Sequence, residues 1–110
     1  MDRLTVRHAS CEDTSFLTLV LAGELEVSNV SKLIDTIVGV LERGDRHLLL
    51  DLTDVSLCDE GSLFTILGIR HAANHLGGSL SIIAASPPVH DAMCQTGLRE
   101  LLPITPGCPL

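Results

Sequence analysis

Apolar runs and amphipathic stretches alternate along this chain and predict a mixed α/β fold. Residues 4–8 alternate between apolar and polar positions, as in a strand with one wet face, whereas 16–22 are almost continuously apolar, as in a strand covered on both faces. The polar turn between them favours a hairpin. The short apolar runs 48–52 and 80–83 predict a third and a fourth strand.

Three further segments carry apolar residues at three- and four-residue steps, which is typical of helices with one buried face. Side chains that suit helix N-termini precede them, and glycines follow them. In chain order the expected caps are Ser28 or Asn29 and Gly44, Asp59 and Gly77-Gly78, and Ser86 and Gly97. The residues expected to face the core are Leu63, Ile66, Leu67, Ala73 and Leu76 in the second helix and Val89 and Met93 in the third.

The order of these elements predicts the fold class. A helix between two apolar strands suits a parallel crossover. Residues 101–104 are expected to form a short last strand at a sheet edge, since Pro103 has no backbone N–H. The sequence therefore predicts a single α/β domain, with order β-β-α-β-α-β-α-β and a mixed four- to five-stranded sheet covered by helices. We expect the domain to span 1–110, with its core at about 4–104 and a frayed tail at 105–110.

Composition excludes several classes of partner. The chain has 110 residues and 45% hydrophobic content, enough to fill one core without a metal. Its net charge of -7 and its lack of Trp and Tyr argue against nucleic acid, which needs basic clusters and stacking platforms. No apolar leader is visible and the run 16–22 is too short to span a bilayer, so we expect a cytoplasmic protein without membrane attachment. The four cysteines form no CxxC pair and are expected to be free thiols, mostly buried.

The most informative stretch runs from Leu48 to Gly68, where an apolar strand passes through an acidic turn into a helix. The turn has one glycine and no lysine, which argues against a phosphate-binding loop. Acids in such turns are more typical of caps than of catalysis, and Ser62 is not part of a GxSxG elbow that would pair it with a distant histidine. We therefore expect no enzyme and no cofactor. The acids considered as catalytic pairs are Asp51, Asp54, Asp59 and Glu60.

Two other groups of residues are candidates for chemical sites. His71 and His75 are four residues apart and would share one helix face, but no third ligand is suggested, so two surface histidines are the favoured interpretation and no metal site is expected. Cys58, next to Asp59, could be a sensing thiol if the helix N-terminus lowers its pKa, although a small buried residue is the more common occupant of such a position.

The combination of element order and local motifs resembles the STAS domain family, and in particular bacterial anti-sigma factor antagonists. The resemblance covers about residues 4–104. The motifs that carry it are Gly23-Glu24-Leu25-Glu26, Leu48-Leu49-Leu50-Asp51-Leu52, Asp59 before Leu63, Ile66-Leu67-Gly68, Gly77-Gly78 and Ser86-Pro87-Pro88-Val89. It implies a non-enzymatic protein that binds an anti-sigma factor, a serine kinase of the histidine-kinase-like ATPase type, and so frees a sigma factor for transcription. A homodimer is left open.

In that family, phosphorylation of a serine at the start of the second helix abolishes binding, and this chain departs from the pattern there. The family order is Asp, Ser or Thr, acceptor Ser, Gly, whereas this chain has Asp59, Glu60, Gly61 and Ser62, so Gly61 holds the acceptor position. One residue is about 100° around a helix, so Ser62 would point elsewhere. Glu60 could supply a fixed charge, Ser62 could still be phosphorylated, or the protein could bind its partner without this switch. We favour the last.

The resemblance implies a docking surface formed by the loop 24–28, the turn 59–62 and the exposed face of the helix that follows. Its expected partner-binding residues are Glu24, Glu26, Ser28, Asp59, Glu60, Gly61, Ser62 and Thr65. The alternative function is a ligand-binding or scaffold STAS subunit of a larger signalling assembly.

Overall fold

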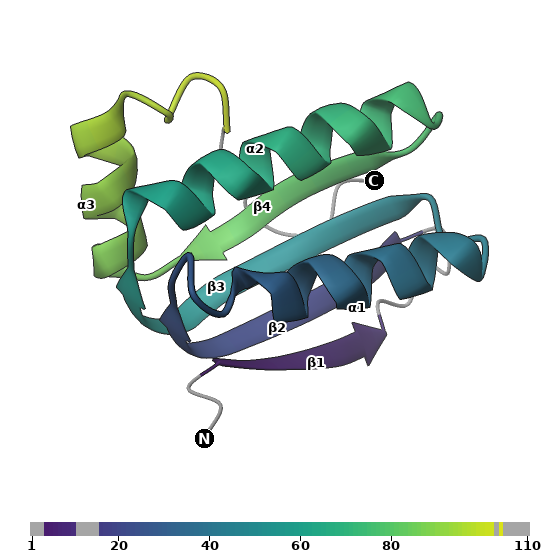
Figure 1. The fold of residues 1–110 in the computed structure, drawn as a ribbon, viewed down its shortest axis with the longest axis horizontal. Coiled ribbons are helices and arrows are strands. Elements are labelled where there is room, and N and C mark those ends of the chain that lie inside the picture. Colours follow the sequence, from purple (N-terminus) through teal and green to yellow (C-terminus); the bar gives the residue numbers. More distant parts are fainter. Residues whose placement is uncertain (1–3, 11–15, 103, 105–110) are drawn as a thin grey trace.

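The computed structural model describes residues 4–10, 16–102 and 104, which form a four-stranded sheet and three helices (Figure 1). In chain order the elements are β1 (Leu4–Ser10), β2 (Phe16–Leu25), α1 (Val30–Glu42), β3 (His47–Cys58), α2 (Glu60–His75), β4 (Ser79–Ala85) and α3 (Pro87–Thr96). The predicted α/β class and the order of these seven elements are confirmed.

The sheet has the order β1-β2-β3-β4, with β1 antiparallel to β2 and the other pairs parallel. The expected hairpin and parallel crossovers are therefore present. Helices α1 and α2 lie side by side over one face of the sheet, while α3 packs against β3 and α2 (Figure 1). Because β2, β3 and β4 run in the same direction, the loops that follow β2 and β3 meet at one edge of the sheet.

Aliphatic side chains from every layer form the core. Leu19, Leu21, Leu50 and Leu52 are fully buried on the sheet, and α1 and α2 cover them with residues that include Leu33. Each fully buried leucine contributes about 1.5–3 kcal/mol relative to an exposed one. The expected core residues Leu63, Ile66, Ala73, Val89 and Met93 are buried, and Leu67 packs partly buried against the same cluster.

Leu76 was expected to face inward, and this prediction was wrong. Leu76 is 60% exposed, because it follows the last helical residue of α2 as the C-cap and no longer continues the buried face of the helix. The cysteines were expected to be mostly buried, and this was wrong for the two that the structure describes: Cys58 is half-buried and Cys94 is exposed on α3. Cys11 and Cys108 lie outside the described residues.

The expected fifth strand is reduced to a single parallel bridge between Ile82 and Ile104. The preceding residues turn instead of extending, because the backbone N–H groups of Leu101 and Leu102 both donate to the carbonyl of Leu98, at 3.0 and 2.7 Å. The frayed tail expected at 105–110 lies outside the described residues. Among the described helices, none combines the length and apolar character needed to cross a membrane.

Of three expected helix caps, Gly97 has the predicted role, whereas Ser86 and Asn29 use their side chains elsewhere. Gly97 ends α3 in the left-handed conformation, with a φ of 73°, as its position predicted. Ser86 precedes α3 but makes no side-chain cap, because its hydroxyl donates to the carbonyl of Val55 at 2.5 Å and so joins α3 to β3. Asn29 likewise precedes α1 without capping it through its side chain, which is used in the loop described below.

Candidate functional site

The carboxylate of Asp59 joins the two loops that meet at the carboxyl edge of the sheet. One oxygen accepts a hydrogen bond from the backbone N–H of Ser62 at 2.9 Å, which caps α2 as predicted. The other oxygen accepts from the backbone N–H of Val27, also at 2.9 Å. The backbone N–H of Asp59 in turn donates to the carbonyl of Leu25 at 3.2 Å. A single side chain therefore fixes the start of α2 against the loop after β2.

The pKa of Asp59 reflects these bonds. Partial burial by itself would raise the pKa of this carboxyl, but the N–H groups of Val27 and Ser62 stabilise the charged form more strongly and lower it below the usual 3.8. The carboxylate is therefore ionised at neutral pH and lies at the positive end of the α2 dipole.

The loop between β2 and α1 is held together by Asn29. Its side-chain carbonyl accepts from the backbone N–H of Glu26 at 2.9 Å, and its amide donates to the carbonyl of Glu24 at 2.8 Å. The hydroxyl of Ser28 donates to the Glu26 carboxylate at 3.3 Å. The expected docking residues of this loop are therefore part of one hydrogen-bonded turn. The sequence predicted Asn29 only as an alternative helix cap. An amide side chain carries both donors and an acceptor, so it can also bridge two backbone groups of a loop, as Asn29 does here.

Val27 covers the position of Gly61. A Cβ atom on Gly61 would overlap Cγ2 of Val27, which is itself 59% exposed and held in place by the bond from its N–H to Asp59. The other nearby side-chain atoms, Cβ of Val27 and a carboxylate oxygen of Asp59, are 3.7 and 3.9 Å away from that Cβ position and leave ordinary van der Waals room. Any larger residue at Gly61 therefore requires Val27 to move.

Ser62 is fully buried, and its hydroxyl points back into the protein. The Oγ atom lies 2.9 Å from the carbonyl oxygen of Asp59 and 3.3 Å from that of Leu25, and it can donate to either. In this structure a kinase reaches the hydroxyl only if the first turn of α2 opens.

Cys58 lies beside Ser62, with 3.8 Å between the thiol sulfur and Oγ. Burial raises the pKa of the thiol above its usual value, and the negative charge of Asp59 acts in the same direction, against a lowering by the hydrogen bond to Ser62. The thiol is protonated at neutral pH, which argues against the sensing role considered from the sequence.

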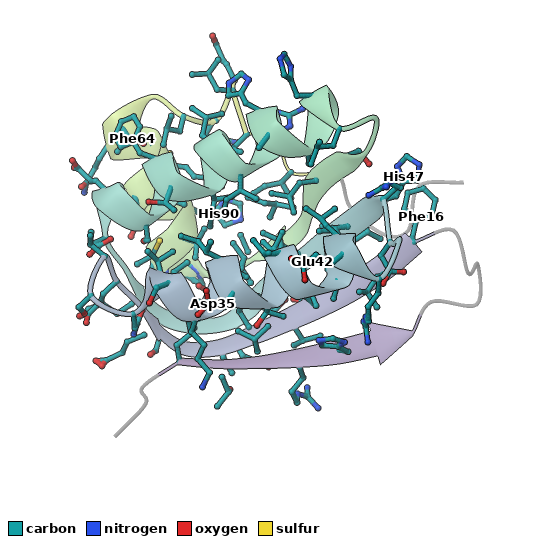
Figure 2. The ribbon with its side chains drawn as sticks, turned by 45° about the vertical axis from the view of Figure 1, so that its right-hand side comes forward. Phe16, Asp35, Glu42, His47, Phe64 and His90 are labelled. Atoms are coloured by element: carbon teal, nitrogen blue, oxygen red, sulfur yellow. The ribbon has the colours of Figure 1, made fainter. Side chains whose placement is uncertain are left out.

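The exposed face of α2 extends along the helix from Gly61. Phe64 and Gly68 follow at three- and four-residue steps and are exposed, and Phe64 is 52% exposed although the chain has only two aromatic residues (Figure 2). Thr65 is half-buried, and its hydroxyl donates to the carbonyl of Gly61 at 2.9 Å. Sequence reasoning did not select Phe64 as a site residue; a large aromatic side chain on the polar face of an amphipathic pattern was the available signal.

Among the four acids considered as catalytic pairs, Asp51 and Asp54 lie on β3, apart from the hydrogen bonds of Asp59. Asp51 accepts hydrogen bonds from the backbone N–H and the hydroxyl of Thr53, at 3.0 and 2.6 Å, and Asp54 is exposed further along β3. Neither makes a described hydrogen bond to Asp59 or Glu60. His71 and His75 are exposed near the end of α2, and within the described residues no third His, Cys, Asp or Glu joins them as a metal ligand.

Comparisons with known proteins point to one family and to relatives with similar names. The model of the family described as "Mlab, STAS domain" matches residues 12–103. An anti-sigma F factor antagonist of Paenibacillus polymyxa is 31% identical over 59% of this chain and 56% of its own length. An anti-sigma-B factor antagonist of Staphylococcus epidermidis is 27% identical over 84% of this chain and 85% of its own.

A solved structure has the same fold. An anti-sigma factor antagonist from Mycobacterium paratuberculosis superimposes with a TM-score of 0.73 at 18% identity, covering 94% of this chain and 86% of the other. At that identity the likeness concerns the fold alone.

Proposed function

Because this chain belongs to the STAS domain family, we propose that it acts as an anti-sigma factor antagonist, a non-enzymatic regulator that binds an anti-sigma factor and so frees a sigma factor for transcription. Curated relatives that bear this name, and whose alignments reach 84% of the chain, support the proposal. This role places the protein in the cytoplasm, where transcription takes place.

The observation that carries the proposal is the double hydrogen bond of the Asp59 carboxylate, which holds the two loops as one surface. We define the docking surface as the residues of these loops and of the outer face of α2 that lie next to this bond. They are Glu24, Glu26, Val27, Ser28, Asp59, Glu60, Gly61, Phe64 and Thr65; Ser62, which sequence reasoning included, supports the surface from below.

The composition of the docking surface indicates what it binds. Val27 and Phe64 are large, exposed and apolar, and Gly61 between them adds no side chain. The acids Glu24, Glu26, Asp59 and Glu60 surround this centre. Apolar anchors in the middle of an interface supply most of its binding energy, and charged rims select the partner. The partner surface is therefore an apolar depression flanked by lysine or arginine, and we assign it to a serine kinase of the histidine-kinase-like ATPase type.

We further propose that binding is not switched off by phosphorylation. The acceptor position is Gly61, which has no hydroxyl, and the nearby Ser62 hydroxyl is fully buried and donates to backbone carbonyls. Glu60 is a weak substitute for a phosphate, because one carboxylate has less charge and fewer acceptor oxygens. The antagonist is then available whenever it is synthesised.

The test is a titration of the purified protein against each purified anti-sigma kinase of the same bacterium, followed by incubation with ATP and intact-mass measurement. We expect one kinase to bind, Phe64→Ala to weaken that binding at least about tenfold, as truncation of an aromatic anchor does, and no phosphate to be added. Val38→Ala is the matched control, since Val38 is 47% exposed on α1 and outside the docking surface.

The outcomes separate the two parts of the proposal. If no anti-sigma factor binds, the antagonist function is wrong, and the ligand-binding or scaffold role becomes the leading prediction. If a kinase binds and adds a phosphate that maps to Ser62, the function holds but the unswitched mode is wrong. Native mass spectrometry of the same samples measures whether the protein is a homodimer, which stays a prediction.

A further inference from the structure

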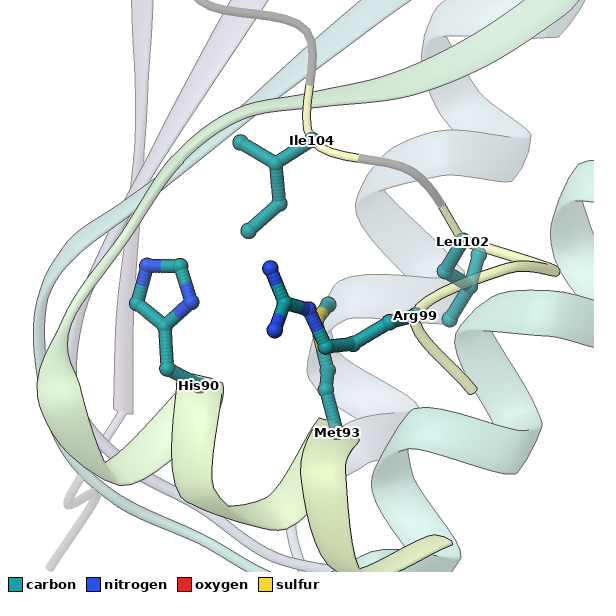
Figure 3. Close-up of a pocket in the computed structure, with 5 residues that line it drawn as sticks. All are labelled: His90, Met93, Arg99, Leu102 and Ile104. Carbon is teal, nitrogen blue, oxygen red and sulfur yellow. The ribbon is translucent and has the colours of Figure 1, made fainter. Parts of the chain in front are cut away.

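A small pocket lies between α3 and the segment that follows it, and no residue of the docking surface lines it. Its volume is about 280 Å³, and its lining residues are His90, Met93, Arg99, Leu102 and Ile104 (Figure 3). Helix α3 provides the first two, and the segment from Gly97 to Ile104 provides the others. Two of the lining residues, Leu102 and Ile104, thus come from the range 101–104 that the sequence predicted to be an edge strand.

The apolar part of the pocket is well packed. Met93 is fully buried and Leu102 nearly so, and both belong to the main hydrophobic core. Ile104 is fixed by its bridge to Ile82. The backbone carbonyl of Leu101 also accepts a hydrogen bond from the Arg70 guanidinium of α2. The walls are therefore held by contacts to the rest of the domain and do not depend on a ligand.

The polar part of the pocket is basic. The guanidinium of Arg99 and the imidazole of His90 extend into the same space, with Ile104 bordering it (Figure 3). The described contact of the Arg99 side chain is a 3.9 Å approach to the sulfur of Cys94, and a thiol is a weak acceptor. None of the described lining residues is an acid, although the chain has fourteen acidic and seven basic residues. Among the described residues, most of the donors of Arg99 therefore have no acceptor, and they are available to one that enters the pocket.

We propose that this pocket binds a small organic carboxylate with a short apolar body. A guanidinium presents its N–H groups in a planar fork that matches a carboxylate, and the His90 ring adds a further donor. Met93, Leu102 and Ile104 then contact the apolar body. The volume lies near the lower end of the roughly 300–1,000 Å³ range of ligand pockets, which limits the ligand to a few carbons or one ring. The inference does not depend on the proposed function.

The test is a titration of the ¹⁵N-labelled protein with sodium benzoate, monitored by amide chemical shifts. We expect saturable shifts at residues 90–94, 98–102 and 104, with a Kd of about 1 mM for so small a ligand. Benzamide, which has the same ring but no charge, should give no saturable shift there. Arg99→Gln should weaken benzoate binding about tenfold or more, since a charge-assisted pair is lost.

Arg7→Gln is the matched control, because Arg7 is exposed on β1 and does not line the pocket. It should leave the benzoate Kd unchanged. Shifts that stay linear in concentration, or that are the same in Arg99→Gln, would overturn the proposal. Saturable binding of phenyl phosphate without binding of benzoate would overturn the choice of a carboxylate.

Discussion

Val27 lies over Gly61, so that its Cγ2 atom fills the space that a side chain at Gly61 would need. The two residues belong to different loops, and the hydrogen bond from the N–H of Val27 to Asp59 keeps them together. The glycine at this position is thus matched to its neighbour and is not merely a missing serine.

This relationship predicts a coupling that a double-mutant cycle can measure. Gly61→Ala gains about 0.5–1 kcal/mol of helix propensity, but the overlap with Val27 costs about 1–3 kcal/mol, so the single variant should be less stable than the parent. In a Val27→Ala background the overlap disappears, and Gly61→Ala should become stabilising. Denaturant unfolding of the four proteins gives the coupling energy.

Gly68→Ala is the control for this cycle. Gly68 lies in the same helix, and a Cβ there meets nothing within 4 Å. It should be stabilising in both backgrounds, by about 0.5–1 kcal/mol. Additivity of Gly61→Ala and Val27→Ala would show that Val27 simply rotates away and that the two positions are independent.

Removal of the Asp59 carboxylate should loosen the docking surface. Asp59→Ala loses the helix cap and leaves the N–H of Val27 without its partner, so we expect a loss of about 1–3 kcal/mol in unfolding free energy. Hydrogen exchange should speed up at Val27 and Ser62. Asp54→Ala, at an exposed position without a described hydrogen bond, should change neither quantity.

The lowered pKa of Asp59 predicts a contribution to acid sensitivity. A carboxyl whose pKa is lower in the folded state stabilises the fold at pH values above its unfolded pKa, near 3.8, and this stabilisation is lost as the pH falls through the folded value. Unfolding free energies measured between neutral pH and strongly acidic pH should therefore fall less steeply below about pH 4 in Asp59→Asn than in the parent. An identical slope in both proteins would contradict the assignment.

A charge at Ser62 should disrupt the fold instead of mimicking a regulated state. Ser62→Asp places a carboxylate at a fully buried position that faces the carbonyl oxygens of Asp59 and Leu25, so we expect a loss of about 3 kcal/mol or more. Thermal unfolding measures it. Ser31→Asp adds the same charge at an exposed site in the first turn of α1 and should be neutral or slightly stabilising.

The two described free cysteines should react at different rates. Cys58 is half-buried and its pKa is raised, so little thiolate is present at neutral pH, whereas Cys94 is exposed. Iodoacetamide labelling followed by peptide mass mapping should modify Cys94 first. In Cys94→Ser, labelling of Cys58 should remain slow unless denaturant is added; rapid labelling of the native protein would mean that this thiol is activated.

The sequence was sufficient for the features that depend on local pattern. The apolar runs of the strands predicted the sheet, and Asp59 before an amphipathic stretch predicted the cap of α2. The position of Leu76 was mispredicted because helical spacing was continued past the residue where α2 ends. The last strand was mispredicted because turn hydrogen bonds to Leu98 compete with strand pairing there.

The candidate site was predictable only in part, because its defining contacts join distant segments. Asp59 was selected as a cap, yet its bond to Val27 crosses 32 positions and has no periodic signal. Helix geometry predicted that Ser62 points away from the acceptor direction, but not that it is fully buried with its hydroxyl near the carbonyl of Leu25 on β2. To identify Phe64 as a site residue, one must know which face of α2 is left exposed by the rest of the domain.

The same bond between Val27 and Asp59 has a consequence for the life of the protein in the cell. Its two ends lie in the loops that follow β2 and β3, and the parallel pairing of these two strands brings the loops together. A nascent or misfolded chain has no such edge, so it cannot compete for a partner. If the protein acts as proposed, only folded molecules can bind the partner, so the regulatory output falls only under conditions that unfold an appreciable fraction of them.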